Sequence, residues 1–137
     1  MIPSRAEAEI VCDEPDRARQ AAAKMEEELK QEYEVRDPGL RVQVTVGQTG
    51  ARMADSPQAT AHFLNLLTAL PTGVQAMNPS VPGMVETSLN LGVISSDDST
   101  ITIQYSIRSS LESAKNALTD RVMAIFCSGG CEGKGRQ

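Results

Sequence analysis

The single histidine and the three cysteines are the residues best suited to metal binding or nucleophilic chemistry, because imidazole and thiolate groups are common zinc ligands and nucleophiles. His62 precedes Phe63 in a helical apolar repeat, and the chain has no second histidine with which to build a zinc site. Cys127 and Cys131 are separated by three residues, without two further ligands beside them. We therefore expect a structural or surface role for His62, free thiols at both cysteines, and neither a metal site nor a catalytic residue in this chain.

Arg108 is the residue most suited to binding an anion. It stands on the polar side of an alternating segment, immediately before a predicted helix, and its planar guanidinium could hold a ligand carboxylate through two parallel hydrogen bonds. If the hairpin turns about Asp97 and Asp98, Arg108 lies roughly opposite Glu86, and a cross-strand ion pair explains it more simply. Residue chemistry alone favours the ion pair, because exposed arginine–glutamate pairs are common and weak.

Composition argues against several classes of function. The 137 residues, 40% hydrophobic and 23% charged, are typical of one ordinary globular domain. A net charge of −5, two Phe, two Tyr and no Trp provide neither the basic surface nor the stacking aromatics of a nucleic-acid-binding protein. No apolar run approaches the roughly 20 residues that cross a bilayer, and no secretory signal is visible. An odd number of cysteines does not form a disulfide framework, so we expect a cytoplasmic protein. From the charge and the short apolar runs, we expect neither a nucleic-acid nor a membrane partner.

Hydrophobic periodicity predicts both strands and helices. Apolar and polar residues alternate as in strands at residues 6–12, 40–46, 85–93 and 101–108. Steps of three and four residues predict helices at residues 15–35, at 57–70 after the N-cap Ser56, and from Ser109 or Ser110 to about Ile125. Residues 71–83 hold three prolines and two glycines, which predicts an irregular connection.

The order β-α-β-α-β-β-α predicts an α+β fold, with a four-stranded antiparallel sheet that carries its helices on one face. The other face would then be polar and exposed, and it would include Arg108. We expect one domain over residues 2–126, followed by a flexible C-terminal tail over residues 127–137, which has four glycines and no periodicity.

Several stretches of the chain are similar to the aminoacyl-histidine dipeptidases, the bacterial Xaa-His dipeptidases of the zinc aminopeptidase and carboxypeptidase clan. The stretches are residues 63–74, residues 84–93 with the sequence MVETSLNLGV, and residues 107–110 with the sequence IRSS. Residues 2–8 resemble the segment that opens a strand of the family's lid. The resemblance runs in order from Ile2 to about Ile125 and does not extend to the rest of such an enzyme.

In that family a catalytic domain binds two zinc ions, and a lid domain of ferredoxin-like fold is inserted into it. The metal-ligand motifs have no match here, so the resemblance implies a lid and dimerisation domain without a cofactor, and two zinc ions in an absent catalytic domain. Lid motifs of the family that would precede Met1 are missing, including an Asn immediately before Ala-Ile-Pro, so we expect Met1 to be an artificial boundary or a truncated start. Homodimer contacts would involve residues 40–46 or the second helix.

Arg108 matches the family's lid arginine, which is thought to hold the C-terminal carboxylate of the substrate, and this match reverses the preference stated above. Two functional hypotheses follow. In the first, the chain is inactive alone, and it binds the dipeptide carboxylate for a zinc-dependent Xaa-His dipeptidase whose catalytic domain is its partner. In the second, it is a free-standing, non-catalytic α+β binding or assembly module with the same fold.

Overall fold

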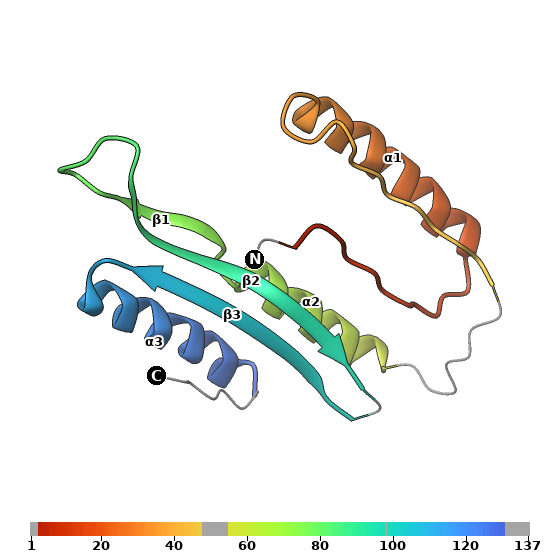
Figure 1. Cartoon of the computed structure of the whole chain (residues 1–137). Helices are drawn as coiled ribbons and strands as arrows, with labels where there is room; N and C mark the ends of the chain where they lie inside the picture. The colour runs from red at the N-terminus through yellow and green to blue at the C-terminus, as the bar shows by residue number, and fades with distance from the viewer. Residues whose placement is uncertain (1–2, 48–54, 98, 131–137) are drawn as a thin grey trace. The chain divides into compact units, whose positions relative to one another are not determined.

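The computed structural model describes residues 3–47, 55–97 and 99–130. Contacts divide the chain into two compact units, one formed by Met1–Ala6 with Asp55–Gln137 and the other by Glu7–Ala54. The described residues form three helices and three strands (Figure 1), which in chain order are α1 (Pro15–Tyr33), α2 (Pro57–Ala69), β1 (Gly73–Met77), β2 (Val85–Ser96), β3 (Ile101–Ser109) and α3 (Glu112–Ser128). The fold is therefore α+β, as the sequence predicts.

The three strands form one antiparallel sheet in the order β1-β2-β3. One face of this sheet is covered by α2 and α3. The buried core is small and apolar, and it joins both helices to the central strand through Leu66, Leu70, Leu89, Leu118 and Val122. We call the opposite face the open face; on β2 and β3 it carries Glu86, Ser88, Asn90, Ser106 and Arg108.

The β2–β3 hairpin contains a bulge at Gly92. Leu91 lies opposite Tyr105, whereas Val93 lies opposite Gln104, so Gly92 is the extra residue between the two pairs. One extra residue exchanges the two faces of a strand. Val93, which the alternation predicts to face the core, therefore lies on the open face and is 47% exposed.

Asp97 holds the turn of this hairpin. Its Oδ1 atom accepts hydrogen bonds from the backbone N–H groups of Ser99 and Thr100, both at 2.8 Å, and from the Ser99 hydroxyl at 3.1 Å. The bonds from Ser99, followed by the one from Thr100, lower the pKa of the Asp97 carboxyl below its ordinary value, because they favour the charged form.

Protonation of Asp97 is expected to weaken the turn in acid. A folded-state pKa below the ordinary value of 3.8 means that the carboxylate stabilises the fold at neutral pH, and that this contribution is lost as the pH falls below 3.8 and through the folded-state pKa. Asp97→Asn keeps an acceptor oxygen but does not titrate. Melting temperatures measured over this acid range should fall more steeply for the original protein than for the variant; parallel curves would contradict the prediction.

Two of the predicted strands are wrong. Residues 6–12 and 40–46 lie within the described part of the chain and form no strand. Alternation shows which side chains could share a face, but a strand also needs a neighbour for its backbone hydrogen bonds, and neither segment pairs with a strand among the described residues. The four-stranded sheet and the ferredoxin order are accordingly not found; the observed order is α-α-β-β-β-α.

Strand β1 lies where the sequence predicts an irregular connection. It is only five residues long, and its pairing with β2 is interrupted by register shifts, so it has no clear alternation. Pro79 and Pro82 follow the strand, in a loop where Asn78 Oδ1 accepts the N–H groups of Ser80 at 2.9 Å and Val81 at 3.1 Å. The prolines therefore mark the loop and do not prevent the strand before it.

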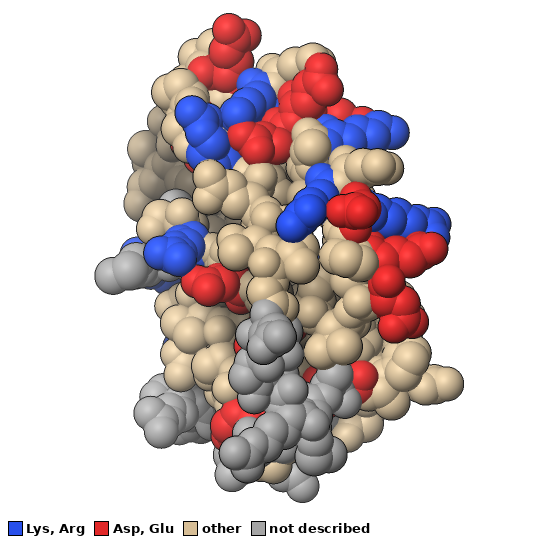
Figure 2. Space-filling model, turned by 90° about the vertical axis from the view of Figure 1, so that its right-hand side faces the viewer, with Lys and Arg blue, Asp and Glu red and all other residues tan. Residues whose placement is uncertain are grey.

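The second unit contains α1 and the segments on either side of it. Helix α1 confirms the predicted helix and has Pro15 in its first turn. Exposed ion pairs run along its surface, between Glu14 and Arg17 at 3.0 Å, Asp16 and Arg19 at 3.3 Å, and Lys24 and Glu28 at 3.8 Å, and a partly buried pair joins Glu26 and Lys30. Acidic and basic side chains are interspersed on the face drawn in Figure 2. No residue between 7 and 47 is buried, so the described part of this unit has no core of its own.

The ends of α2 and α3 show how well the caps are predicted. Ser56 Oγ accepts the N–H of Ala59 at 3.1 Å, which confirms the predicted N-cap of α2. Helix α3 instead has Leu111 at its N-cap.

Helix α3 continues through Ser128, so Cys127 lies in its last turn, beyond the predicted start of the tail. Residues 131–137, which include Cys131, lie outside the described residues, and the bounds 2–126 and 127–137 stay a prediction.

Candidate functional site

Arg108 lies near the end of β3, exposed on the open face. Ser88 of β2 stands directly opposite it, and Val74 of β1 stands opposite Ser88. Directly paired residues of antiparallel strands project to the same side of a sheet, with Cβ atoms roughly 4.5–5.5 Å apart. Val74, Ser88 and Arg108 therefore form one row across all three strands, which we call the Arg108 row.

The predicted ion pair between Arg108 and Glu86 is not formed. Glu86 lies two residues from Ser88 along β2, and its carbonyl oxygen accepts the N–H of Ser110 at 3.0 Å. Within the described ranges, the Arg108 guanidinium makes neither an ion pair nor a hydrogen bond. Its N–H donors are thus available to a ligand.

The Arg108 row itself holds no acidic side chain, although Glu86 lies on the same face, two residues from Ser88 along β2. The next row along the hairpin pairs Asn90 with Ser106, so an amide and a hydroxyl lie beside the Arg108 row. Neither row contains a carboxylate that would compete with an anionic ligand for the guanidinium. A bidentate guanidinium among neutral hydrogen-bonding groups is suited to binding a carboxylate.

The strand end that carries Arg108 is fixed from the covered side of the sheet. Thr87 is 4% exposed, and its hydroxyl lies 2.8 Å from the hydroxyl of Ser109, its partner across the hairpin. Ser109 Oγ also accepts the N–H of Leu111 at 3.1 Å, immediately before α3. These bonds hold the backbone next to Arg108, so that its side chain starts from a defined position.

The histidine and the described cysteines form no candidate metal or catalytic site. His62 Nε2 is 2.6 Å from the carbonyl oxygen of Gly129, and this contact links α2 to the C-terminal end of α3. Cys12 and Cys127 are exposed free thiols. Over residues 3–47, 55–97 and 99–130, no three His, Cys, Asp or Glu side chains lie together as a metal would require. The donors of the described chain therefore do not fit a zinc ion.

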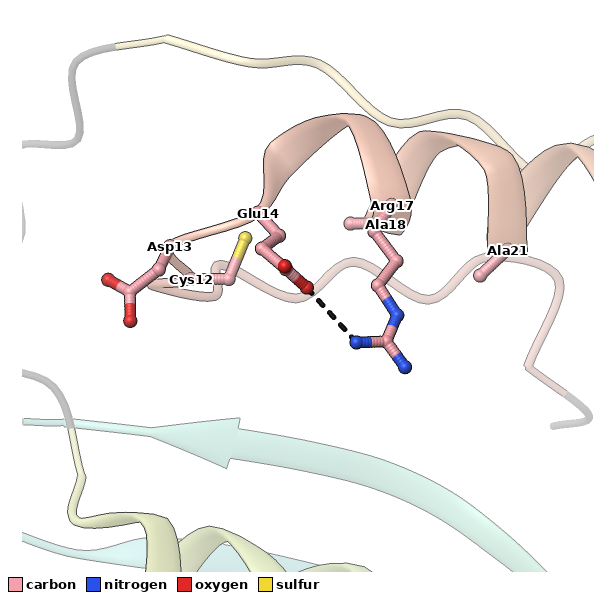
Figure 3. A pocket seen from close by; sticks show the side chains of 6 residues that line it. All are labelled: Cys12, Asp13, Glu14, Arg17, Ala18 and Ala21. Atoms are coloured by element: carbon pink, nitrogen blue, oxygen red, sulfur yellow. Dashed lines mark hydrogen bonds and ion pairs between the residues drawn. The ribbon is translucent and has the colours of Figure 1, made fainter.

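An open hollow of about 530 Å³ lies at the start of α1 in the second unit (Figure 3). It is lined by Cys12, Asp13, Glu14, Arg17, Ala18 and Ala21. Figure 3 shows Arg17 directed toward Glu14, and the two form an ion pair at 3.0 Å. The guanidinium in this hollow is already neutralised, unlike that of Arg108, so the open face provides the better anion site.

Sequence reasoning missed Ser88 and Val74 as neighbours of Arg108. A hairpin that turns about Asp97 and Asp98 without an extra residue puts Arg108 roughly opposite Glu86, whereas the observed turn together with the extra residue Gly92 puts it opposite Ser88. Two signals were present in the sequence: an aspartate followed by Ser99 and Thr100 favours a turn that begins at Asp97, and a glycine within a strand often marks a bulge.

Among the helices that the structure describes, none has the length and apolar character needed to span a membrane. No protein-family model matches the chain. Over 54 residues the chain is 43% identical to the cytosol non-specific dipeptidase of Escherichia coli (strain K12), a match that covers 39% of this chain and 11% of that protein. The crystal structure of aminoacylhistidine dipeptidase from Vibrio alginolyticus matches with a TM-score of 0.74 and 25% identity, over 88% of this chain and 24% of that one. The chain thus spans about a quarter of the length of its solved relative.

Proposed function

Since this chain is a segment homologous to part of the aminoacylhistidine and cytosol non-specific dipeptidases, we propose that it is the lid of such a dipeptidase. In this proposal Arg108 binds the C-terminal carboxylate of an Xaa-His dipeptide. The observation that carries it is the exposed guanidinium of Arg108, which has no internal partner in the described chain and has the neutral side chains of Ser88, Asn90 and Ser106 beside it. A bidentate contact of this kind fixes the orientation of the substrate as well as its affinity.

The division of labour between lid and catalytic domain follows from the side chains present. The described residues hold no metal-ligand cluster, so we assign the hydrolytic centre, with two zinc ions, to a catalytic domain outside this segment. A lid that closes over a bound dipeptide supplies an anion clamp and excludes water, without contributing a ligand to the metals. We also propose a cytoplasmic location, which the name of the Escherichia coli relative supports.

Activity and metal content together test this assignment. The complete protein that contains this segment should hydrolyse Xaa-His dipeptides and retain zinc, whereas the segment alone should do neither, because it lacks a ligand set. Amino-acid release and metal analysis on both samples would show this. Two zinc ions bound per isolated segment, or a complete protein without dipeptidase activity, would contradict the proposal, and the latter result would favour a free-standing binding or assembly module.

We further propose a homodimer that forms through the outer edge of β1. Residues 40–46, one of the two candidate surfaces, form no strand, whereas β1 is an edge strand, with no described strand beside its outer backbone groups. Exposed apolar side chains lie on β1 and the loop after it, at Val74, Met77, Val81 and Met84. Two such edges could pair antiparallel about a two-fold axis.

A charge on this edge should weaken the dimer. Met77 is 51% exposed, so Met77→Lys is expected to shift the complete protein from dimer toward monomer, because a lysine on the edge opposes strand pairing. Sedimentation velocity over a range of protein concentrations measures this shift. Leu64→Lys, at a 55% exposed position on α2, is the control, which also tests the second candidate surface. If Leu64→Lys dissociates the dimer and Met77→Lys does not, the interface lies on α2 and not on β1.

A further inference from the structure

We propose that Ser88 is a second donor to the carboxylate held by Arg108, and that the two residues together select substrates with a free C-terminus. This inference rests on the proposed function of Arg108. Ser88 and Arg108 are a directly opposed pair of the β2–β3 hairpin, so their side chains leave the same face of the sheet from neighbouring positions. A carboxylate bound by Arg108 would thus lie within reach of the Ser88 hydroxyl.

The Ser88 hydroxyl has no competing partner in the part of the chain that the structure describes. No hydrogen bond of this hydroxyl is found there, although the side chain is half-buried. Its neighbour on β1 is Val74, which offers only methyl groups. The Ser88 hydroxyl is therefore free to donate a hydrogen bond toward Arg108, where the ligand carboxylate would lie.

The backbone of Ser88 is held rigidly. Thr87 and Leu89, the residues on either side, are 4% and 2% exposed, and both face the core. Central strand β2 is also paired with a strand along each of its edges. A donor on such a backbone needs little reorganisation when a ligand binds.

The two hydrogen-bond donors of the Arg108 row, the Arg108 guanidinium and the Ser88 hydroxyl, distinguish a carboxylate from a carboxamide. Both oxygens of a carboxylate accept hydrogen bonds, so one can be shared between the guanidinium and the hydroxyl. A carboxamide has one acceptor oxygen, and its NH₂ group would face the N–H donors of Arg108. The Arg108 row should therefore favour dipeptides over their C-terminal amides.

Steady-state kinetics of the complete dipeptidase with an Xaa-His dipeptide test this inference. Ser88→Ala is expected to raise KM by about 10-fold with little change in kcat. The substitution removes a hydrogen bond to a charged group, and this bond stabilises the bound substrate and the transition state equally. Ser88→Thr, which keeps the hydroxyl, should stay within about twofold of the original KM. Ser95→Ala changes an exposed serine of the same strand, opposite Thr102, and is the matched control.

Comparison with Arg108→Lys separates this inference from the proposed function. If Arg108→Lys impairs the enzyme while Ser88→Ala leaves KM unchanged, Ser88 does not contact the substrate, and the role of Arg108 stands. If neither variant changes the kinetics, both proposals fail. An equal rise in KM for Ser95→Ala would also overturn the assignment of Ser88, because the effect would not be local to the Arg108 row.

Discussion

Replacing Arg108 by lysine in the complete dipeptidase is expected to lower kcat/KM for an Xaa-His dipeptide by between a few-fold and about 10³-fold. Lysine keeps the positive charge but has a single ammonium group, which cannot make two parallel hydrogen bonds to one carboxylate. The upper limit corresponds to about 4 kcal/mol of transition-state stabilisation. Initial rates over a range of dipeptide concentrations would measure kcat and KM separately.

The control for this variant is Arg121→Lys. Arg121 is an exposed arginine of α3, away from the strand residues of the Arg108 row, so its replacement should leave kcat/KM unchanged. Unchanged kinetics for Arg108→Lys would mean that Arg108 is a surface residue without a ligand. A loss for both variants would point to a general effect of arginine replacement and not to carboxylate binding.

Leu89→Ala is expected to lower the free energy of unfolding of this chain by about 2–5 kcal/mol. Leu89 is 2% exposed and lies at the centre of the core, in one cluster with leucines of both α2 and α3. Its truncation removes buried apolar surface and leaves a cavity, since the surrounding side chains relax only in part. Urea denaturation followed by circular dichroism would measure the loss.

Leu64→Ala is the matched control, because Leu64 lies on α2 but is 55% exposed. Its replacement should change the free energy of unfolding by less than about 1 kcal/mol. Equal losses for the two variants would show that Leu89 does not lie at the centre of the core and that the face of the sheet covered by the helices is misassigned.

Helices α2 and α3 and the long hairpin could be predicted because the periodicity within each element marks the side chains that face the core. Leu66, Leu70, Leu118 and Val122 are predicted to face inward from helical spacing alone, and all four are buried. Helices α2 and α3 each bury one stripe against the hairpin, so a local pattern is sufficient to identify the buried face. Ser56 could be predicted as an N-cap for the same reason, since an N-cap side chain accepts a backbone N–H within the first turn of its helix.

The remaining strands depend on pairing between segments, which a local pattern does not specify. Residues 6–12 and 40–46 have the alternation of strands but no neighbouring strand, while β1 has little alternation and pairs with β2. Part of the site was missed for a related reason. The resemblance to a known family singled out Arg108, but Ser88 depends on the register, which the bulge at Gly92 and the turn at Asp97 determine together.

The most direct test of carboxylate binding by Arg108 compares a non-hydrolysed dipeptide analogue with its C-terminal amide, as competitive inhibitors of the complete dipeptidase and of its Arg108→Ala variant. The account predicts that the original enzyme binds the free acid at least about 10-fold more tightly than the amide, because a hydrogen bond to a charged group is lost in the amide. In the Arg108→Ala variant this preference should disappear. The same preference in both enzymes would contradict the account, since the carboxylate would then be bound by other residues.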